Sequence, residues 1–526
     1  MYWTPPIELN TIEKKISQRT QKAKKLFVFL REHRHQIINE ELEQQLIAMY
    51  QEGGSEPAIP GQLAMATLLQ AYCHVSDKEA VELTVMDRRW QMVLNCLECE
   101  RPPFSQATLV SFRERLIAHD MDKALLNRTV EIAEEYGDFG HRQLRAVLDS
   151  SPLLGAGRVE DTFNLLGHAL LKAVRAAAKE LKKPVATILA EAQLALVGKS
   201  SLKAALDLDW GQPNAKTQAL TKIVEELERW KQWVSLQAKL AEPCPPLEAP
   251  MAAITQILAQ DTEPNSHGTG LVIKNDVASD RRVSIEDPQM RHGRKSKNHR
   301  FNGFKEHLLT DLDSQATKEV VVFPANVPEQ AAIDALHNEL QPAGGLHELQ
   351  IDLAYAAHPK LTEWEEQGVK ITTRPWPERA RGVFAKRDFQ FDFEKMTLTC
   401  PAGQSIDMVL GQTVHFAAAI CNHCPLRKQC MTGKNNKYYG RGIKIRKDEQ
   451  SQANRRAKVK TPEGRAELRQ RVLIEHRIAH QIATQGRKAR YLGTRKNQFN
   501  GRRNAAVNNL QLAQKYWAAK PDRAVA

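Results

Sequence analysis

A short apolar run, LRAVLD at residues 144–149, interrupts a chain that is otherwise helical in pattern on either side of it. The run ends in Ser150, Ser151 and Pro152, which is typical of a strand that enters a loop. Residues up to about 130 have helical periodicity, and the Ala/Leu-rich residues 166–197 return to it. The chain therefore combines helices with at least one buried strand, and its other strands have to come from further along the sequence.

These strands are expected in one later block. Apolar, β-branched runs predict strands at residues 301–309, 319–323, 346–353 and 369–373, with a helix at 329–340 between the second and the third. Together with residues 144–149 they indicate an α/β fold with a mixed sheet flanked by helices.

Two insertions are expected to interrupt this sheet. The first, 166–269, contains a helix at 217–241 with an apolar seam, followed by a linker marked by Pro243, Pro245, Pro246 and Pro250 and by residues 265–270. The second, 376–459, is polar, basic and cysteine-bearing, and an amphipathic helix resumes near Pro462.

The first 135 residues are predicted to form a separate helical domain. Ser76 and Glu79 have capping-box spacing, and another helix is expected to begin at Ser105. Short helices joined by turns suit a DNA-binding or dimerising domain, although a helical bundle that never contacts a groove has the same periodicity.

Charge is concentrated in one part of the chain. The net charge is +13, and residues 434–503 alone hold 21 Lys and Arg against 5 Asp and Glu. A polyanion such as nucleic acid is the natural partner for this segment, because each neutralised phosphate releases condensed counterions. A basic surface that serves only solubility is the alternative.

Composition excludes several classes of protein. With 42% hydrophobic and 26% charged residues, the 526-residue chain is neither disordered nor a disulfide scaffold. It has neither a signal-like start nor a run of about 18 apolar residues that could span a membrane. We therefore expect a soluble, cytoplasmic protein without a membrane partner.

Three carboxylates are candidates for chemistry. Asp149 and Asp352 lie at or near the ends of predicted strands, where an α/β sheet opens to ligands, although a single Asp in such a place is often a turn or cap residue. Glu475 is expected in the middle of an apolar helix face, near Leu468, Val472, Ile478, Ala479 and Ile482. Arg471, one turn earlier, can pair with it, and a buried structural ion pair is the alternative to a functional role.

Two strand-end aspartates and one inward glutamate predict an oxygen-rich site for Mg²⁺ or Mn²⁺. Two such ions about 3.5–4 Å apart can stabilise the attacking and leaving oxygens of a phosphodiester. The site is therefore suited to phosphoryl transfer.

In the order of these elements the chain resembles the DDE transposases of bacterial insertion sequences. The resemblance rests on LDSSPLLGAGRVED around Asp149, IDLAYAAHP around Asp352 and RVLIEHRIAHQIATQGRKARYLGTRK around Glu475. The stretches EDPQMRHGRKS, NGFKEHLLTD and LVSFRERL extend it over most of the chain.

The resemblance implies a ribonuclease-H-like catalytic core built from residues 140–165, 270–375 and 460–510. It also implies that Asp149, Asp352 and Glu475 hold two Mg²⁺ or Mn²⁺ ions for cleavage of DNA ends and strand transfer, with Arg471 steadying a phosphate or orienting Glu475. The partners would be double-stranded DNA, carrying the terminal inverted repeats and the target, and a second copy of the chain.

The sequence departs from the family in two ways. The intervals between the three carboxylates, 203 and 123 residues, are long, which the two insertions account for. Many relatives carry Tyr three residues before the helix Arg and Lys seven residues after the Glu, whereas this chain has Leu468 and Ile482 there. DNA-end contacts are therefore expected from elsewhere.

Cysteine spacing predicts a second metal site. Cys400, Cys421, Cys424 and Cys430 lie in one loop-rich segment, an arrangement suited to a structural tetrahedral Zn²⁺ site. Free reduced thiols are the alternative, and His423 could replace one ligand.

Basic residues near the expected core are candidates for phosphate contacts, and a solvated loop is the alternative for the first six. The candidates are Arg291, Arg294, Lys295, Lys297, Arg300, Lys305, Arg490 and Lys496. The expected function is that of an insertion-sequence transposase. A non-catalytic DNA-binding descendant and a nuclease without strand transfer remain open as alternatives.

Overall fold

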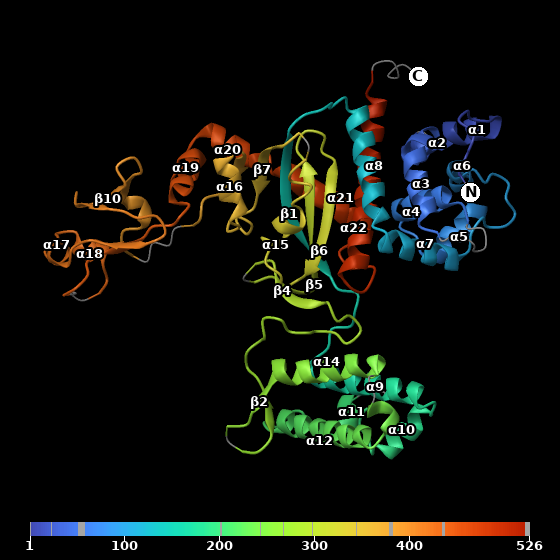
Figure 1. Cartoon of the computed structure of the whole chain (residues 1–526), viewed down its shortest axis with the longest axis horizontal. Helices are drawn as coiled ribbons and strands as arrows, with labels where there is room; N and C mark the ends of the chain where they lie inside the picture. The colour runs from blue at the N-terminus through green and yellow to red at the C-terminus, as the bar shows by residue number, and fades with distance from the viewer. Residues whose placement is uncertain are drawn as a thin grey trace. The chain divides into compact units, whose positions relative to one another are not determined.

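The structure is a computed structural model that describes residues 2–20, 22, 24–50, 58–199, 202–241, 244–266, 268–296, 298–342, 344–377, 382–433 and 437–520. It contains two compact units (Figure 1). Unit 1 comprises Met1–Gly140, Ser150–Glu339 and Arg477–Ala526, and unit 2 comprises His141–Asp149 and Leu340–His476.

Unit 1 begins with helices, as expected for the first 135 residues. Ser76 and Glu79 form the predicted capping box, with Glu79 N donating to Ser76 Oγ at 3.2 Å and Ser76 N donating to the Glu79 carboxylate at 2.8 Å. Ser105 caps the helix that follows it, as predicted. The helices are α1 (Thr11–Thr20), α2 (Lys25–Ile37), α3 (Glu40–Ala48), α4 (Pro60–Cys73), α5 (Asp77–Met86), α6 (Arg88–Leu94), α7 (Gln106–Ala118) and α8 (Met121–Tyr136).

The last helix, α22 (Thr494–Ala518), lies alongside α8 in unit 1 (Figure 1) and also packs against α4. Its apolar and polar residues are both buried, among them Phe499, Leu510, Arg502 and Asn509. Asn509 accepts from Thr317 N and donates to Thr317 O, each at 2.9 Å, and so satisfies both backbone groups of that strand residue.

The strands of unit 1 confirm the expected pair at 301–309 and 319–323. They are β4 (Arg291–Arg294), β5 (Arg300–Asp311) and β6 (Thr317–Pro324), and both β4 and β6 pair antiparallel with β5. Gly303 has φ +151, and a Cβ there would lie 2.2 Å from the Leu153 carbonyl oxygen, so a residue without a side chain lets the backbones approach this closely. The helix expected at 329–340 is shorter, α15 (Ala331–Ala335).

The first insertion is helical, as expected, and it has its own core. Leu220, Ile223, Leu227 and Trp230, which form the predicted seam, are all buried. Its elements are α9 (Thr162–Glu180), α10 (Val185–Glu191), α11 (Leu202–Leu206), α12 (Ala215–Ser235), α13 (Ala238–Ala241), α14 (Pro245–Asp261) and the hairpin β2 (Thr262–Pro264) with β3 (Leu271–Ile273).

The proline-rich linker predicted here is wrong for the described residues, because they begin helix α14; Pro243 lies outside the described residues. Pro245 occupies the first turn, where its missing N–H would have no helical partner in any case. Pro250 lies inside the helix and removes one backbone hydrogen bond. Burial of Leu247, Ile254 and Ile257 offsets that loss.

Unit 2 contains the parallel part of the sheet. The first residues of β1 (Leu144–Leu154) pair with β7 (Leu346–Ile351), and β7 pairs with β8 (Lys370–Thr372), which confirms these three predicted strands. The buried residues Ala146, Val147 and Leu148 are contiguous, as expected for a strand covered on both faces. The helices are α16 (Lys360–Glu366), α19 (Glu449–Lys460) and α20 (Pro462–Arg469).

Two predicted boundaries are wrong. β1 does not end at Asp149 but continues to Leu154 in unit 1, where Leu154 N donates to Arg487 O at 2.9 Å and Ala489 N donates to Leu154 O at 2.7 Å. The single helix predicted from Pro462 is broken, because α20 ends at Arg469 and α21 (Val472–Gln485) begins at Val472.

The cysteine-bearing segment of unit 2 forms a small lobe with its own apolar core, which includes Phe389, Leu398, Phe416 and Ile445. Its elements are η1 (Lys386–Asp388), β9 (Gln390–Asp392), β10 (Thr397–Thr399), β11 (Ser405–Asp407), β12 (Thr413–His415), α17 (Ala418–Asn422), α18 (Arg427–Cys430) and β13 (Gly442–Lys444). β9, β10 and β11 form one antiparallel sheet, and β12 pairs with β13.

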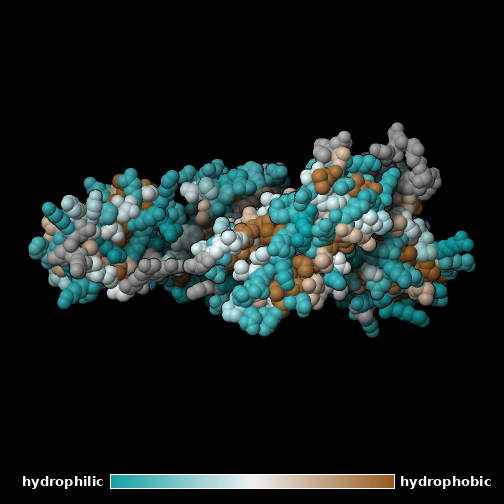
Figure 2. Space-filling model, turned by 90° about the horizontal axis from the view of Figure 1, so that it is seen from below, coloured by the Kyte–Doolittle hydropathy of each residue, from teal (hydrophilic) through white to brown (hydrophobic). Residues whose placement is uncertain are grey.

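Strands and helices together confirm the predicted α/β class, with a mixed sheet that has six strands among the described residues. On the face seen in Figure 2, hydrophilic side chains cover most of the surface and hydrophobic ones form small patches. No helix within the described ranges combines the length and the apolar character needed to cross a membrane.

Candidate active site

Asp149 and Asp352 are brought together by the register of two parallel strands in unit 2. Leu148 of β1 pairs with Ile351 of β7. The residue that follows each of them is an aspartate, so the two carboxylates lie on neighbouring segments where β7 ends beside β1. The sequence predicted each aspartate separately, and the strand pairing makes them neighbours.

Arg471 links the two aspartates. Its Nη2 donates to Asp149 Oδ2 at 2.9 Å, and its Nη1 donates to Asp352 Oδ1 at 3.3 Å. The side chains of Arg471 and Asp149 are 17% and 19% exposed, whereas that of Asp352 is 50% exposed. The two carboxylates thus share the single positive charge of one guanidinium, in a site that is only partly open to water.

Glu475 does not have the buried position expected for it. The glutamate is exposed in the first turn of α21, and its neighbour Ile474 is buried instead. The expectation assumed that the apolar face around Glu475 packs into the core, but Val472 and Ala479, which share that face in α21, are exposed as well. Across the described ranges, no three His, Cys, Asp or Glu side chains are grouped closely enough to hold a metal ion.

A polar network lies beside the aspartates on the same strands. Glu348 is buried and accepts from Arg145 Nη2 at 2.9 Å, from Gln350 Nε2 at 3.1 Å and from Thr372 Oγ1 at 3.1 Å. Burial tends to raise the pKa of Glu348, but the hydrogen bonds from Gln350 and Arg145 and the charge of Lys370 hold it below its usual value. Glu348 is therefore held as a carboxylate.

The network also anchors the end of α20. Gln470 Oε1 accepts from Gln350 Nε2 at 3.2 Å and from Arg145 Nη2 at 3.4 Å, and Glu467 pairs with Lys370 and Lys458. The sequence analysis did not single out Glu348 or Gln350. The sequence did contain a signal for them: Glu348, Gln350 and Asp352 are alternate residues, and alternate residues of a strand share one face of the sheet.

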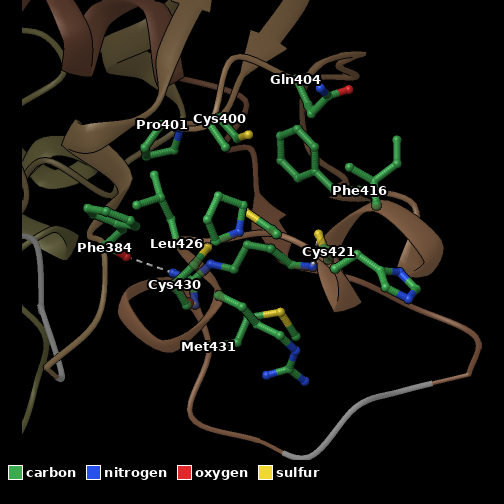
Figure 3. Close-up of a pocket in the computed structure, with 16 residues that line it drawn as sticks. Phe384, Cys400, Pro401, Gln404, Phe416, Cys421, Leu426, Cys430 and Met431 are labelled. Carbon is green, nitrogen blue, oxygen red and sulfur yellow. Dashed lines mark hydrogen bonds between the residues drawn. The ribbon is translucent and has the colours of Figure 1, made fainter.

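The four cysteines of the small lobe line one cavity of about 500 Å³. Figure 3 shows Cys400, Cys421 and Cys430 around this cavity, and Cys424 also lines it. Burial raises the pKa of the Cys430 thiol, Arg441 opposes the rise, and the other three cysteines add to it. The thiols are therefore near one another, although they are not grouped as metal ligands.

Arg441 fixes the segments that carry these cysteines. Its Nη1 donates to Cys430 O at 3.0 Å, its Nη2 donates to Phe384 O at 2.9 Å, and its backbone N–H donates to Cys421 Sγ at 3.5 Å. His423, the alternative ligand, is exposed; it also lines the cavity.

The predicted phosphate-contact residues differ in their surroundings. Arg294, Lys295, Arg300, Arg490 and Lys496 are exposed. Arg291 pairs with Asp280 at 2.7 Å, and Lys305 is buried, bonded to Glu329 and to Val327 O at 2.9 Å each. Lys297 lies outside the described residues. Of the exposed residues, Arg490 also donates from Nη2 to Val75 O at 2.9 Å. Arg291 and Lys305 are occupied within the protein.

Comparison with protein families identifies two regions. The family described as a Transposase DDE domain matches residues 399–512, and the family described as a Transposase domain (DUF772) matches residues 11–115. These two matches support a DDE transposase of an insertion sequence. No curated protein and no solved structure matches it.

The two matches cover different parts of the chain. The DDE match includes Arg471, Glu475 and the four cysteines, but neither Asp149 nor Asp352. The other match covers α1 to α6 and most of α7. The resemblance of this chain to insertion-sequence transposases is thereby confirmed.

Proposed function

We propose that this transposase cleaves DNA at the terminal inverted repeats of an insertion sequence and joins the freed end to target DNA, using divalent metal ions held by Asp149, Asp352 and Glu475. The observation that carries the proposal is the pair of aspartates at matching positions of the neighbouring parallel strands β1 and β7, which share one cation, Arg471. Carboxylates are the ligands that Mg²⁺ and Mn²⁺ prefer, and here two carboxylates already surround one positive charge. Such ions, when bound, would activate a nucleophilic water or 3′-OH and stabilise the leaving oxygen.

Strand order supports a ribonuclease-H-like core. The sheet contains the strand order β6, β5, β1, β7 and β8. In it, β6 pairs antiparallel with β5, whereas β1, β7 and β8 run parallel to one another. We attribute this order to a ribonuclease-H-like core. In this core Asp149 comes from the first strand and Asp352 follows the fourth. Glu475 lies in the first turn of α21, four residues after Arg471, which contacts both aspartates.

We infer three further features of the reaction. The N-terminal helices would bind the inverted repeats, and the exposed residues Arg294, Lys295, Arg300, Arg490 and Lys496 would contact phosphates. Because two DNA ends must meet, the active form would be a homodimer. Cys400, Cys421, Cys424 and Cys430 would close on one Zn²⁺, since four thiols around one cavity form the donor set of a structural zinc site.

The test uses supercoiled plasmid that carries the ends of the element, the full chain and Mg²⁺. Asp149→Asn, Asp352→Asn and Glu475→Gln should each lower end cleavage at least about a hundredfold while leaving end binding intact. Asp407→Asn, which changes an exposed acid on β11, is the matched control and should cleave normally.

The products separate the alternatives. Cleaved ends joined to target DNA support a transposase, and cleavage without joining indicates a nuclease. End binding with no cleavage under any divalent ion indicates a non-catalytic DNA-binding protein. Normal cleavage by Asp149→Asn would contradict the assigned site.

A further inference from the structure

The guanidinium of Arg471 lies where the two aspartates would share a cation. It donates to Oδ2 of Asp149 and to Oδ1 of Asp352 through separate nitrogens, at 2.9 and 3.3 Å. Without a cation, two carboxylates at neighbouring positions of adjacent strands would repel each other. The arginine supplies that charge from within the chain.

A divalent ion bound by both aspartates needs the same carboxylate oxygens. Arg471 and the ion therefore exclude each other at this place. We propose that Arg471 is the internal counter-ion of the metal-free site and that it must release Asp149 and Asp352 before they accept a divalent cation, an inference that rests on the proposed function.

The surroundings of Arg471 suit a side chain that is exchanged. Its Nε is buried and has no hydrogen-bond partner in the described part of the chain, so the bridging contacts do not satisfy the whole guanidinium. Arg471 also lies between α20 and α21, outside both helices. Its release thus needs no helical hydrogen bond to break.

The residue before it is held firmly. Gln470 bonds to Gln350 and Arg145 at 3.2 and 3.4 Å, which ties the end of α20 to β7 and β1. The side chain of Arg471 can therefore leave the aspartates while the backbone at Gln470 stays in place. Exchange then becomes a local rotation rather than an unfolding of unit 2.

The test measures metal binding directly, by titration of the full chain with Mn²⁺ in the absence of DNA. Arg471→Gln should bind Mn²⁺ about tenfold more tightly than the wild type, because the competing charge is gone. Arg469→Gln, which removes an exposed arginine two residues away, is the matched control and should change the affinity less than about twofold.

Thermal unfolding gives a second readout. Without metal, Arg471→Gln should have a lower melting temperature than Arg469→Gln, because its two aspartates have lost their counter-ion. Mn²⁺ should then raise the melting temperature of Arg471→Gln by more than it raises that of Arg469→Gln. Arg471→Lys keeps the charge and should fall between the wild type and Arg471→Gln in affinity, which keeps the inference testable if the glutamine variant folds poorly.

The outcomes distinguish this inference from the proposed function. If Asp149→Asn abolishes Mn²⁺ binding but Arg471→Gln binds no more tightly than the wild type, the metal site stands and the counter-ion role is wrong. If Asp149→Asn binds Mn²⁺ like the wild type, the metal site itself is wrong, and the role of Arg471 falls with it.

Discussion

Arg502 of α22 binds Glu319 of β6 through two parallel hydrogen bonds inside unit 1, Nε to Oε1 at 2.8 Å and Nη2 to Oε2 at 3.0 Å. Both side chains are buried. The same guanidinium reaches Asp120 at 2.6 Å and Asp122 at 3.2 Å. Burial opposes the charge of Arg502, but these carboxylates together raise its pKa above the usual value.

Loss of this arginine should strongly destabilise unit 1. Arg502→Met leaves the buried Glu319 without its two parallel hydrogen bonds and with Lys123 as its remaining ion pair, and we expect a loss of about 3–5 kcal/mol in the free energy of unfolding. Arg495→Met is the control, because Arg495 pairs with the same Asp120 and Asp122 but is 36% exposed, and it should cost less than about 1 kcal/mol. Urea unfolding compares the two, and equal losses would contradict this account.

Glu306 should make unit 1 less stable as the pH rises. Burial raises the pKa of this β5 carboxyl to about 7, although Gln485 and Gln481 partly oppose the shift. A raised carboxyl pKa means that the folded chain holds a proton that the unfolded chain has lost, so stability falls between about pH 4.5 and 7 and stays low above.

Glu306→Gln removes that pH dependence. Near pH 8 the variant should be more stable than the wild type by about 1–3 kcal/mol, and the difference should disappear near pH 4.5. Urea unfolding at several pH values tests this. A variant that is less stable than the wild type at pH 8 would show that Gln485 needs a charged acceptor.

Glu348 should have the opposite dependence. Its lowered pKa means that its contribution is complete above the ordinary value of 4.5 and is lost as the pH falls through the folded-state value. Glu348→Gln should cost about 2–3 kcal/mol at pH 7 and less in acid. Glu366→Gln, an exposed acid on α16, is the control. A loss that does not depend on pH would contradict the charged state assigned to Glu348.

Zinc is expected in the purified chain at about one ion per molecule. Cys421→Ser and Cys430→Ser should lose it, and amide exchange should increase across the small lobe, because metal binding and local folding are coupled. Cys73→Ser, on α4 in unit 1, is the control and should keep its zinc. Metal analysis measures the ion. A metal-free wild-type chain with a protected lobe would contradict the site.

Local patterns were sufficient where one residue type or one periodicity determines the structure. Ser76 with Glu79 predicted a capping box, and the apolar seam of Leu220, Ile223 and Trp230 predicted a buried helix face. Both depend on neighbours within a few residues of each other, which the sequence contains. The same rules failed at Pro245, where proline starts α14, because only the packing of the following apolar residues decides between helix and linker.

The sequence by itself determined the helical start of the chain, the strands β1, β5, β6, β7 and β8 of the sheet, and the two aspartates as separate candidates; it did not predict β4. Only the tertiary structure decided that Leu148 pairs with Ile351, that Arg471 bridges Asp149 and Asp352, and that Glu475 is exposed. The physical reason is distance along the chain. Strand register depends on residues about two hundred positions apart, and the burial of a helix face depends on which other elements pack against it, so neither follows from a local pattern.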